Sequence, residues 1–171
     1  PITTKSADAQ DLFDLGLSLV ISFNHDAAVD VFRQAQAADP NCAMCFWGEA
    51  WAWGPYMNGR MDSDDLPRAQ AAVLDVLFER VGAWMAIETS HGCLFHGAVA
   101  ADPGSEGLRA LLARHKAEVA RRAAAATGLD GREIDLLLIL EGLTQAWSLH
   151  RDTAVTSAKR LGHGLRMNSA A

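Results

Sequence analysis

The chain has 171 residues, of which 50% are hydrophobic and 21% charged, a composition that fits a globular protein with a substantial core. Its net charge of −6 argues against the basic surface that nucleic-acid binding needs, so we expect no direct nucleic-acid partner. The three cysteines cannot all pair with one another and no secretory signal precedes them, which favours a reduced, cytoplasmic setting. The longest aliphatic run, residues 136–140, is too short to cross a bilayer, so no membrane partner is expected.

Helices are predicted throughout, because Ala, Leu, Arg and Glu dominate and the alternation typical of strands is missing. The first helix should bury a face made by Leu12, Leu15, Leu19 and Phe23. A second helix follows the turn at residues 24–26, and a third begins near residue 42.

Loop signals then mark a seam in the chain. Residues 54–67 are rich in Gly, Pro, Asn and Asp, and they form the strongest loop signal of the sequence. Helices resume from residue 66 and are broken at three later points, residues 102–107, 128–131 and 150–152. The fold class is therefore all-α, with one segment over residues 1–72 and another over residues 73–171.

The segment "LFDLGLSLVISFNHDAAVDVFRQAQAADP" has leucines, small residues, one phenylalanine and a closing proline at the spacing of a helical repeat. These residues are Leu12, Leu15, Gly16, Ala28, Phe32, Ala35 and Pro40. Their order resembles a tetratricopeptide repeat, in which two antiparallel helices approach closely at Gly16 and Ala28 while Phe32 fills the gap. A second, irregular repeat starts at Phe46 and departs from the pattern at Gly54. The resemblance covers about residues 7–72, and two repeats alone need further packing, so a protein partner for residues 1–72 is expected.

The rest of the chain combines an aromatic-rich helix end, the run Gly92-Cys93-Leu94-Phe95, a long helix with His115-Lys116-Ala117, an apolar helix with Glu141-Gly142 and a helix of small residues. Their order and spacing over about residues 73–167 resemble the C-terminal ligand-binding and dimerisation domain of TetR-type transcriptional regulators. The resemblance implies tetratricopeptide-like hairpins followed by a TetR C-terminal-type helical bundle. It also implies a non-enzymatic regulatory protein that senses a small molecule.

One departure from that family concerns DNA. TetR-type regulators carry a helix-turn-helix before this domain, and residues 1–72 show neither that pattern nor much positive charge. A natural fusion, a chimera and a sequence discontinuity around residues 59–74 all fit this arrangement. The alternative function is a protein–protein interaction scaffold of tetratricopeptide type, without a small-molecule cavity.

The candidate ligand site centres on His115, which helical spacing places on the apolar face of the long helix. The resemblance implies a cavity enclosed by this helix and its neighbours, and core packing is the alternative for the same side chains. We expect an apolar, neutral or weakly anionic ligand, because polar groups are few among the candidates. The candidate ligand-binding residues are Trp84, Cys93, Phe95, His96, Leu111, Leu112, His115, Leu138 and Trp147.

Neither a metal nor another cofactor is expected. Cys42 and Cys45 have the spacing of half a zinc site, but no second pair follows, so they are interpreted as buried thiols. His91, Cys93 and His96 could supply zinc ligands, but on a helix the three would not share one face.

No catalytic pattern stands out either. The sequence has no nucleophile with a base in a known order and no Gly-rich phosphate loop. Asp62, Asp64 and Asp65 fall in a polar loop, and Glu133 follows Asp130 as a helix-capping partner. The chain is therefore predicted not to be an enzyme.

A homodimer is predicted through residues 132–167. The helix over residues 132–149 is apolar almost all round, so one face remains after its own core is satisfied. The next helix carries a stripe formed by Ala154, Ala158, Leu161 and Leu165. TetR-type domains pair through their last two helices, and this apolar surplus falls in the same place.

Overall fold

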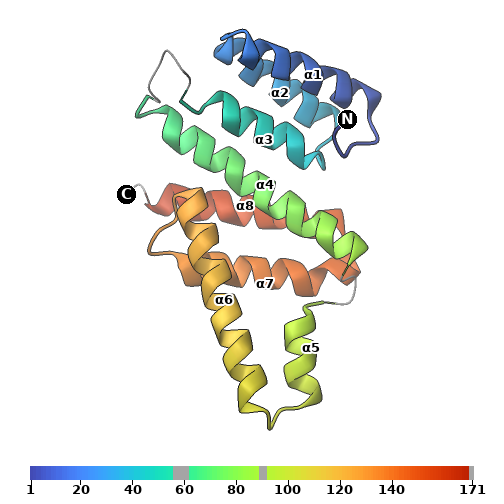
Figure 1. The fold of residues 1–171 in the computed structure, drawn as a ribbon, viewed down its shortest axis with the longest axis vertical. Coiled ribbons are helices and arrows are strands. Elements are labelled where there is room, and N and C mark those ends of the chain that lie inside the picture. The colour runs from blue at the N-terminus through green and yellow to red at the C-terminus, as the bar shows by residue number, and fades with distance from the viewer. Residues whose placement is uncertain (56–61, 89–91, 170–171) are drawn as a thin grey trace. The chain divides into compact units, whose positions relative to one another are not determined.

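The structure is a computed structural model that describes residues 1–55, 62–88 and 92–169. These residues fold into helices without a strand, which confirms the all-α class (Figure 1). The helices are α1 (Ala7–Ile21), α2 (His25–Ala38), α3 (Ala43–Ala52), α4 (Asp65–Ile87), α5 (Leu94–Ala101), α6 (Glu106–Thr127), α7 (Glu133–His150) and α8 (Asp152–Ser169). None of the helices described is long and apolar enough to cross a membrane.

The chain divides into two compact units, unit 1 (Pro1–Glu79) and unit 2 (Arg80–Ala171). The sequence placed its boundary after residue 72, at the loop-rich seam, whereas the division in the structure falls after Glu79. The residues between the two boundaries lie inside α4, so the division occurs within a continuous helix.

In unit 1, the buried face of α1 agrees only in part with the prediction, because Leu12 and Leu19 pack half-buried against the apolar cluster but do not form its centre. The buried residues of α1 are Ala9, Phe13, Gly16 and Val20, while Leu15 and Phe23 are half exposed. The predicted face followed the largest apolar side chains, but the contact is set by the smallest residue of the helix. Gly16 faces α2, and the residues one turn before and after it share its face.

Phe32 on α2 is the centre of this unit. Its ring is fully buried, and the ring centroid lies 5.6 Å from that of Phe13. A Cβ added to Gly16 would come within 2.7 Å of the ring, and one added to Gly48 on α3 within 2.4 Å. Phe32 therefore occupies space that only glycine leaves open on α1 and α3.

The two cysteines at the start of α3, Cys42 and Cys45, are buried as the sequence predicted, but the prediction that they are free thiols is wrong. Cys42 and Cys45 form a disulfide across the first turn, with their Cα atoms 5.4 Å apart. That separation lies within the range a disulfide can bridge, and the position of Cys42 as the helix N-cap produces it. The disulfide belongs to the same apolar cluster as Phe13 and Phe32.

Unit 2 contains the last residues of α4, from Arg80, and the helices α5 to α8. In α6, the Ser105 side chain caps the first turn by accepting from the Leu108 N–H, and Gly128 ends the helix with a positive φ of 66°. The helix α7 buries a stripe against its neighbours, consisting of Leu136, Leu140, Leu143, Thr144 and Trp147. On α8 the buried side chains include Ala154, Val155 and Ala158.

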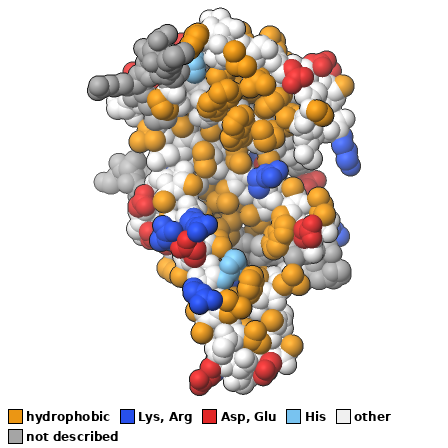
Figure 2. Space-filling model, in the orientation of Figure 1, with side chains coloured by type: hydrophobic (Ala, Val, Ile, Leu, Met, Phe, Trp, Pro, Cys, Tyr) orange, Lys and Arg blue, Asp and Glu red, His pale blue; other side chains and the backbone are white. Residues whose placement is uncertain are grey.

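The pair α5–α6 is much less buried than α7–α8. No residue of α5 is buried, and the buried residues of α6 begin only at Ala120. The first half of α6 and all of α5 form a hairpin whose tip lies away from α7 and α8 (Figure 1). Hydrophobic side chains reach the surface of this hairpin in the lower part of Figure 2.

Candidate functional site

The α5–α6 hairpin carries an open depression of about 610 Å³. Phe95 on α5 and His115 on α6 stack at its centre, with ring centroids 4.3 Å apart and planes 22° from parallel. Leu111, one turn before His115, lines the same depression. Three of the predicted ligand-binding residues therefore share one surface. The depression is open rather than the closed cavity that the resemblance implied.

The wall of this depression is charged on one side. It is formed by Arg114, Ala117, Glu118 and Arg121, one exposed face of α6. Glu118 accepts hydrogen bonds from Arg121 at 2.9 and 3.0 Å and from Arg122 at 2.6 Å. These bonds, from Arg121 first and then Arg122, lower the pKa of Glu118 to about 2. The carboxylate is thus neutralised by two guanidinium groups, and Arg114 adds a cation to the wall.

Beside the stacked rings, a polar cluster joins three helices. Lys116 on α6 donates to the sulfur of Cys93, the N-cap of α5, with Nζ and Sγ 3.3 Å apart. The same ammonium forms an ion pair with Glu141 on α7, whose other oxygen lies 3.3 Å from Nδ1 of His96. Burial acts to lower the pKa of Lys116, but the hydrogen bonds with Glu141 and Cys93 outweigh it and the pKa is raised.

The sequence had selected Cys93 and His96 but not the two residues that connect them. Lys116 and Glu141 are separated from Cys93 by 23 and 48 positions, so no local spacing brings them together. The sequence signal that could have identified them is the position of Lys116 beside the apolar face of α6 and of Glu141 within the apolar helix α7. Ionic groups in such places are rarely buried without a partner.

The remaining predicted residues lie elsewhere in unit 2. Leu112 is half-buried on α6, and Trp84 on α4 is 44% exposed. Trp147 is buried on α7 beneath Arg151, whose guanidinium carbon lies 4.2 Å from the centroid of the ring. Within the part of the chain that the structure describes, the Trp147 Nε1 has no hydrogen-bond partner.

Leu138 is 66% exposed and belongs to a second surface, the α7–α8 groove. This groove has a volume of about 510 Å³. Its lining is mainly apolar and rich in small residues: Leu138, Ile139, Gly142, Leu143, Ala146, His150, Thr153, Ala154, Ser157, Ala158 and Leu161. The predicted site is thus distributed over two surfaces, and ligand binding by its residues stays a prediction.

Metal ligands do not gather among residues 1–55, 62–88 and 92–169, where no three His, Cys, Asp or Glu side chains are placed to hold an ion. Of the candidates named from the sequence, Cys42 and Cys45 are consumed by the disulfide. His91 lies outside the described residues.

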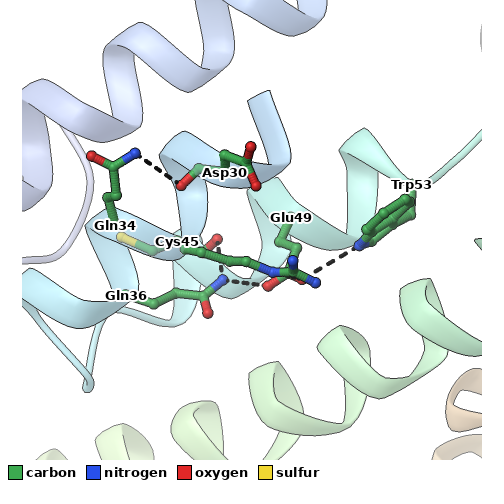
Figure 3. A network of polar contacts seen from close by, with 7 residues as sticks. Asp30, Gln34, Gln36, Cys45, Glu49 and Trp53 are labelled. Atoms are coloured by element: carbon green, nitrogen blue, oxygen red, sulfur yellow. Dashed lines mark hydrogen bonds and ion pairs between the residues drawn. The ribbon is translucent and has the colours of Figure 1, made fainter. Parts of the chain in front are cut away.

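Unit 1 has a polar network of its own around Glu49, a mostly buried carboxylate on α3 (Figure 3). Its oxygens accept from Arg33 Nε at 2.9 Å, Gln36 Nε2 at 2.7 Å and Trp53 Nε1 at 3.3 Å. The guanidinium groups of Arg33 and Arg68 also lie near the Trp53 ring, 5.8 and 4.8 Å from its centroid. Every partner is a donor or a cation, so the network neutralises Glu49 rather than activating it for proton transfer.

Comparisons of this chain with protein families, with curated proteins and with solved structures find no match.

Proposed function

We propose that the chain is a non-enzymatic regulatory protein whose unit 2 dimerises and senses a small molecule, in the manner of the C-terminal domain of TetR-type regulators. The observation that carries this proposal is the α7–α8 groove, an apolar surface on the two helices that such domains use for pairing. No helix-turn-helix is recognisable in the sequence, so the proposal does not include direct DNA recognition.

The α7–α8 groove favours a second copy of the chain as its cover. Leu138 and Leu161 in its lining and Ile134 on the same helix α7 are each more than half exposed, and large contiguous apolar patches are rare on monomers. Gly142, Ala146 and other small residues in the lining permit close helix approach. A two-fold axis along the groove would let each copy bury its own Leu138 against the other, as a self-complementary interface requires.

The proposed ligand site is the depression centred on the Phe95–His115 stack. Its aromatic rings and Leu111 offer apolar surface, and the imidazole of His115 offers a directional polar contact. Arg114 on the wall favours a weakly anionic ligand over a cationic one. A flat aromatic carboxylate combines the two properties.

Light scattering at micromolar concentration tests the dimer. We expect twice the chain mass for the natural sequence and a single chain mass for Leu138→Glu, because that change places a charge in the groove. Leu94→Glu is the matched control, since Leu94 is equally exposed but lies on α5. A monomeric natural chain, or equal loss of the dimer in both variants, would contradict pairing through the groove.

Titration with naphthoate and its uncharged amide tests the ligand site. We expect both to raise the thermal midpoint, and His115→Phe to weaken naphthoate more than the amide while the aromatic stack is kept. If neither compound shifts the midpoint, and the substitution changes stability alone, the sensing role fails even where the dimer stands.

A scaffold of tetratricopeptide type is the second candidate. The position of Phe32 between Gly16 and Gly48 supports a repeat-like packing of α1, α2 and α3. Trp47 and Trp51 form an exposed stack on α3, with ring centroids 5.3 Å apart, where a protein partner could bind. Loss of partner capture in a Trp47→Ala, Trp51→Ala double variant, with no response to either naphthalene compound, would favour the scaffold.

A further inference from the structure

The Cys93–Lys116 contact has the geometry that a covalent bond between the two side chains would need. Nζ of Lys116 and Sγ of Cys93 are 3.3 Å apart, and both side chains are only partly exposed. The same ammonium forms an ion pair with Glu141, whose other carboxylate oxygen lies 3.3 Å from Nδ1 of His96. An amine is therefore fixed beside a thiol, and a carboxylate is placed to take up the proton of the amine.

We propose that oxidation by hydrogen peroxide links Cys93 to Lys116 through a covalent sulfur–nitrogen bond, making this pair a redox switch between α5 and α6. The proposal does not depend on ligand sensing or on dimerisation, because all of its groups belong to one chain.

The reaction has two balanced steps. In the first, the Cys93 thiolate attacks peroxide, the O–O bond breaks, and the products are a sulfenic acid and water; sulfur is oxidised and peroxide reduced. In the second, Lys116 gives a proton to Glu141 and its nitrogen lone pair attacks Sγ. The S–N bond forms as the S–O bond breaks, and the hydroxyl leaves as water, so no further oxidant is needed.

The link would change the electrostatics of unit 2. Lys116 loses its positive charge, and Glu141 keeps only His96 as a nearby partner within this cluster. The start of α5 becomes covalently tied to the middle of α6, close to the Phe95–His115 stack. Oxidation would thus stiffen the α5–α6 hairpin, which has few buried contacts of its own.

The other two cysteines provide an internal reference. Cys42 and Cys45 are fully buried and already joined, so neither has a thiol for peroxide to oxidise. Cys93 is the free cysteine of the chain and is partly exposed. A change after mild oxidation therefore reports on Cys93.

The experiment treats the folded full chain with a small excess of hydrogen peroxide and measures intact mass and tryptic peptides. We expect a loss of two hydrogens, reversed by dithiothreitol. We also expect a peptide in which residues 81–109 are joined to residues 115–121, with no cleavage after Lys116. Gain of oxygen without the joined peptide, or a disulfide between two chains through Cys93, would overturn the proposal.

Variants sharpen the result. Lys116→Arg keeps a cation at the site but lacks the amine, so we expect it to stop at a sulfenic acid that dimedone traps. Lys5→Arg is the matched control, because Lys5 is an exposed lysine in unit 1 and should leave the link unchanged. If Lys116→Arg does not fold, the peptide map of the natural chain still decides the question by the presence or absence of the joined peptide.

Discussion

The α1–α3 core and the α5–α6 hairpin are both built from apolar helices, yet they bury their side chains very differently. In the core, Phe32 is fully enclosed between glycines of two neighbouring helices. In the hairpin, Phe95 stacks on one histidine and lines an open depression. Helix α5 consists largely of apolar residues and buries none of them. An apolar helix thus indicates that another surface packs against it, but not whether that surface belongs to the same chain.

The largest effect should follow removal of the two phenylalanine rings, one from each region. Phe32→Ala leaves a cavity beside Gly16 and Gly48, and we expect a loss of about 3–5 kcal/mol in the free energy of unfolding of unit 1. Phe95→Ala removes a ring that is already partly exposed, so the loss should be well under half of that. Urea unfolding followed by circular dichroism measures both. Equal losses would mean that the hairpin is as tightly packed as the core.

A second comparison uses two leucines on α7. Leu136 is fully buried, and its replacement by Ala should cost about 2–5 kcal/mol. Leu138 points into the α7–α8 groove, so Leu138→Ala should cost no more than about 0.5 kcal/mol in a dilute monomer.

Protein concentration separates the two variants further. If the groove is a dimer interface, the cost of Leu138→Ala in thermal unfolding should grow as the concentration rises, because association stabilises only the natural chain. The cost of Leu136→Ala should show no comparable growth. A concentration-independent cost for Leu138→Ala would remove the groove from the interface.

The third-largest loss of stability is expected for a substitution in the Glu49 network. Glu49→Gln keeps the size of the side chain but replaces one acceptor oxygen with a donor, which faces groups that are themselves donors. We expect a loss of about 1–3 kcal/mol, the cost of leaving a buried polar group unsatisfied. Gln34→Glu, an exchange of the same size in reverse on the exposed face of α2, should change the unfolding midpoint little. Similar effects for both would show that the network contributes no stability.

The sequence predicted the helices well because their ends carry strong local signals. Ser105 caps α6, Gly128 ends it with a positive φ, and Gly131 precedes α7. The buried face of α1 was predicted only in part. Helical spacing wrongly included Leu15 and Phe23, whereas the close approach of Gly16 to Phe32 is confirmed. Local periodicity also has no access to contacts such as Cys93–Lys116, which depend on how separate helices pack.

The candidate site also shows that sequence patterns do not predict contacts between separate helices. Phe95, Leu111 and His115 could be grouped from helical spacing and resemblance, and they do line one depression. Leu138 was grouped with them for its apolar character alone, but it lines the α7–α8 groove instead. Hydrophobicity identifies side chains that are stabilised by burial. Which helix or partner buries them depends on how the helices pack.

The smallest effect concerns the carboxylate in the wall of the depression, Glu118, compared with the buried Glu49. Hydrogen bonds from Arg121 and then Arg122 lower the pKa of Glu118 from 4.5 to about 2. Because the folded-state pKa is lowered, the ion pairs stabilise the protein above pH 4.5, and that contribution is lost as pH falls from 4.5 through about 2. In Glu118→Gln this part of the pH dependence should disappear.

Exposure decides the size of that effect. Glu118 and both arginines are in contact with solvent, which screens the pairs, so at neutral pH Glu118→Gln should lower the unfolding midpoint far less than Glu49→Gln does. Thermal unfolding of the natural chain and both variants from pH 7 down to pH 2 makes the comparison. The natural chain and Glu118→Gln should converge as pH falls through the window below 4.5. A gap that persists unchanged at pH 2 would show that Glu118 stabilises α6 through packing of its side chain rather than through its charge.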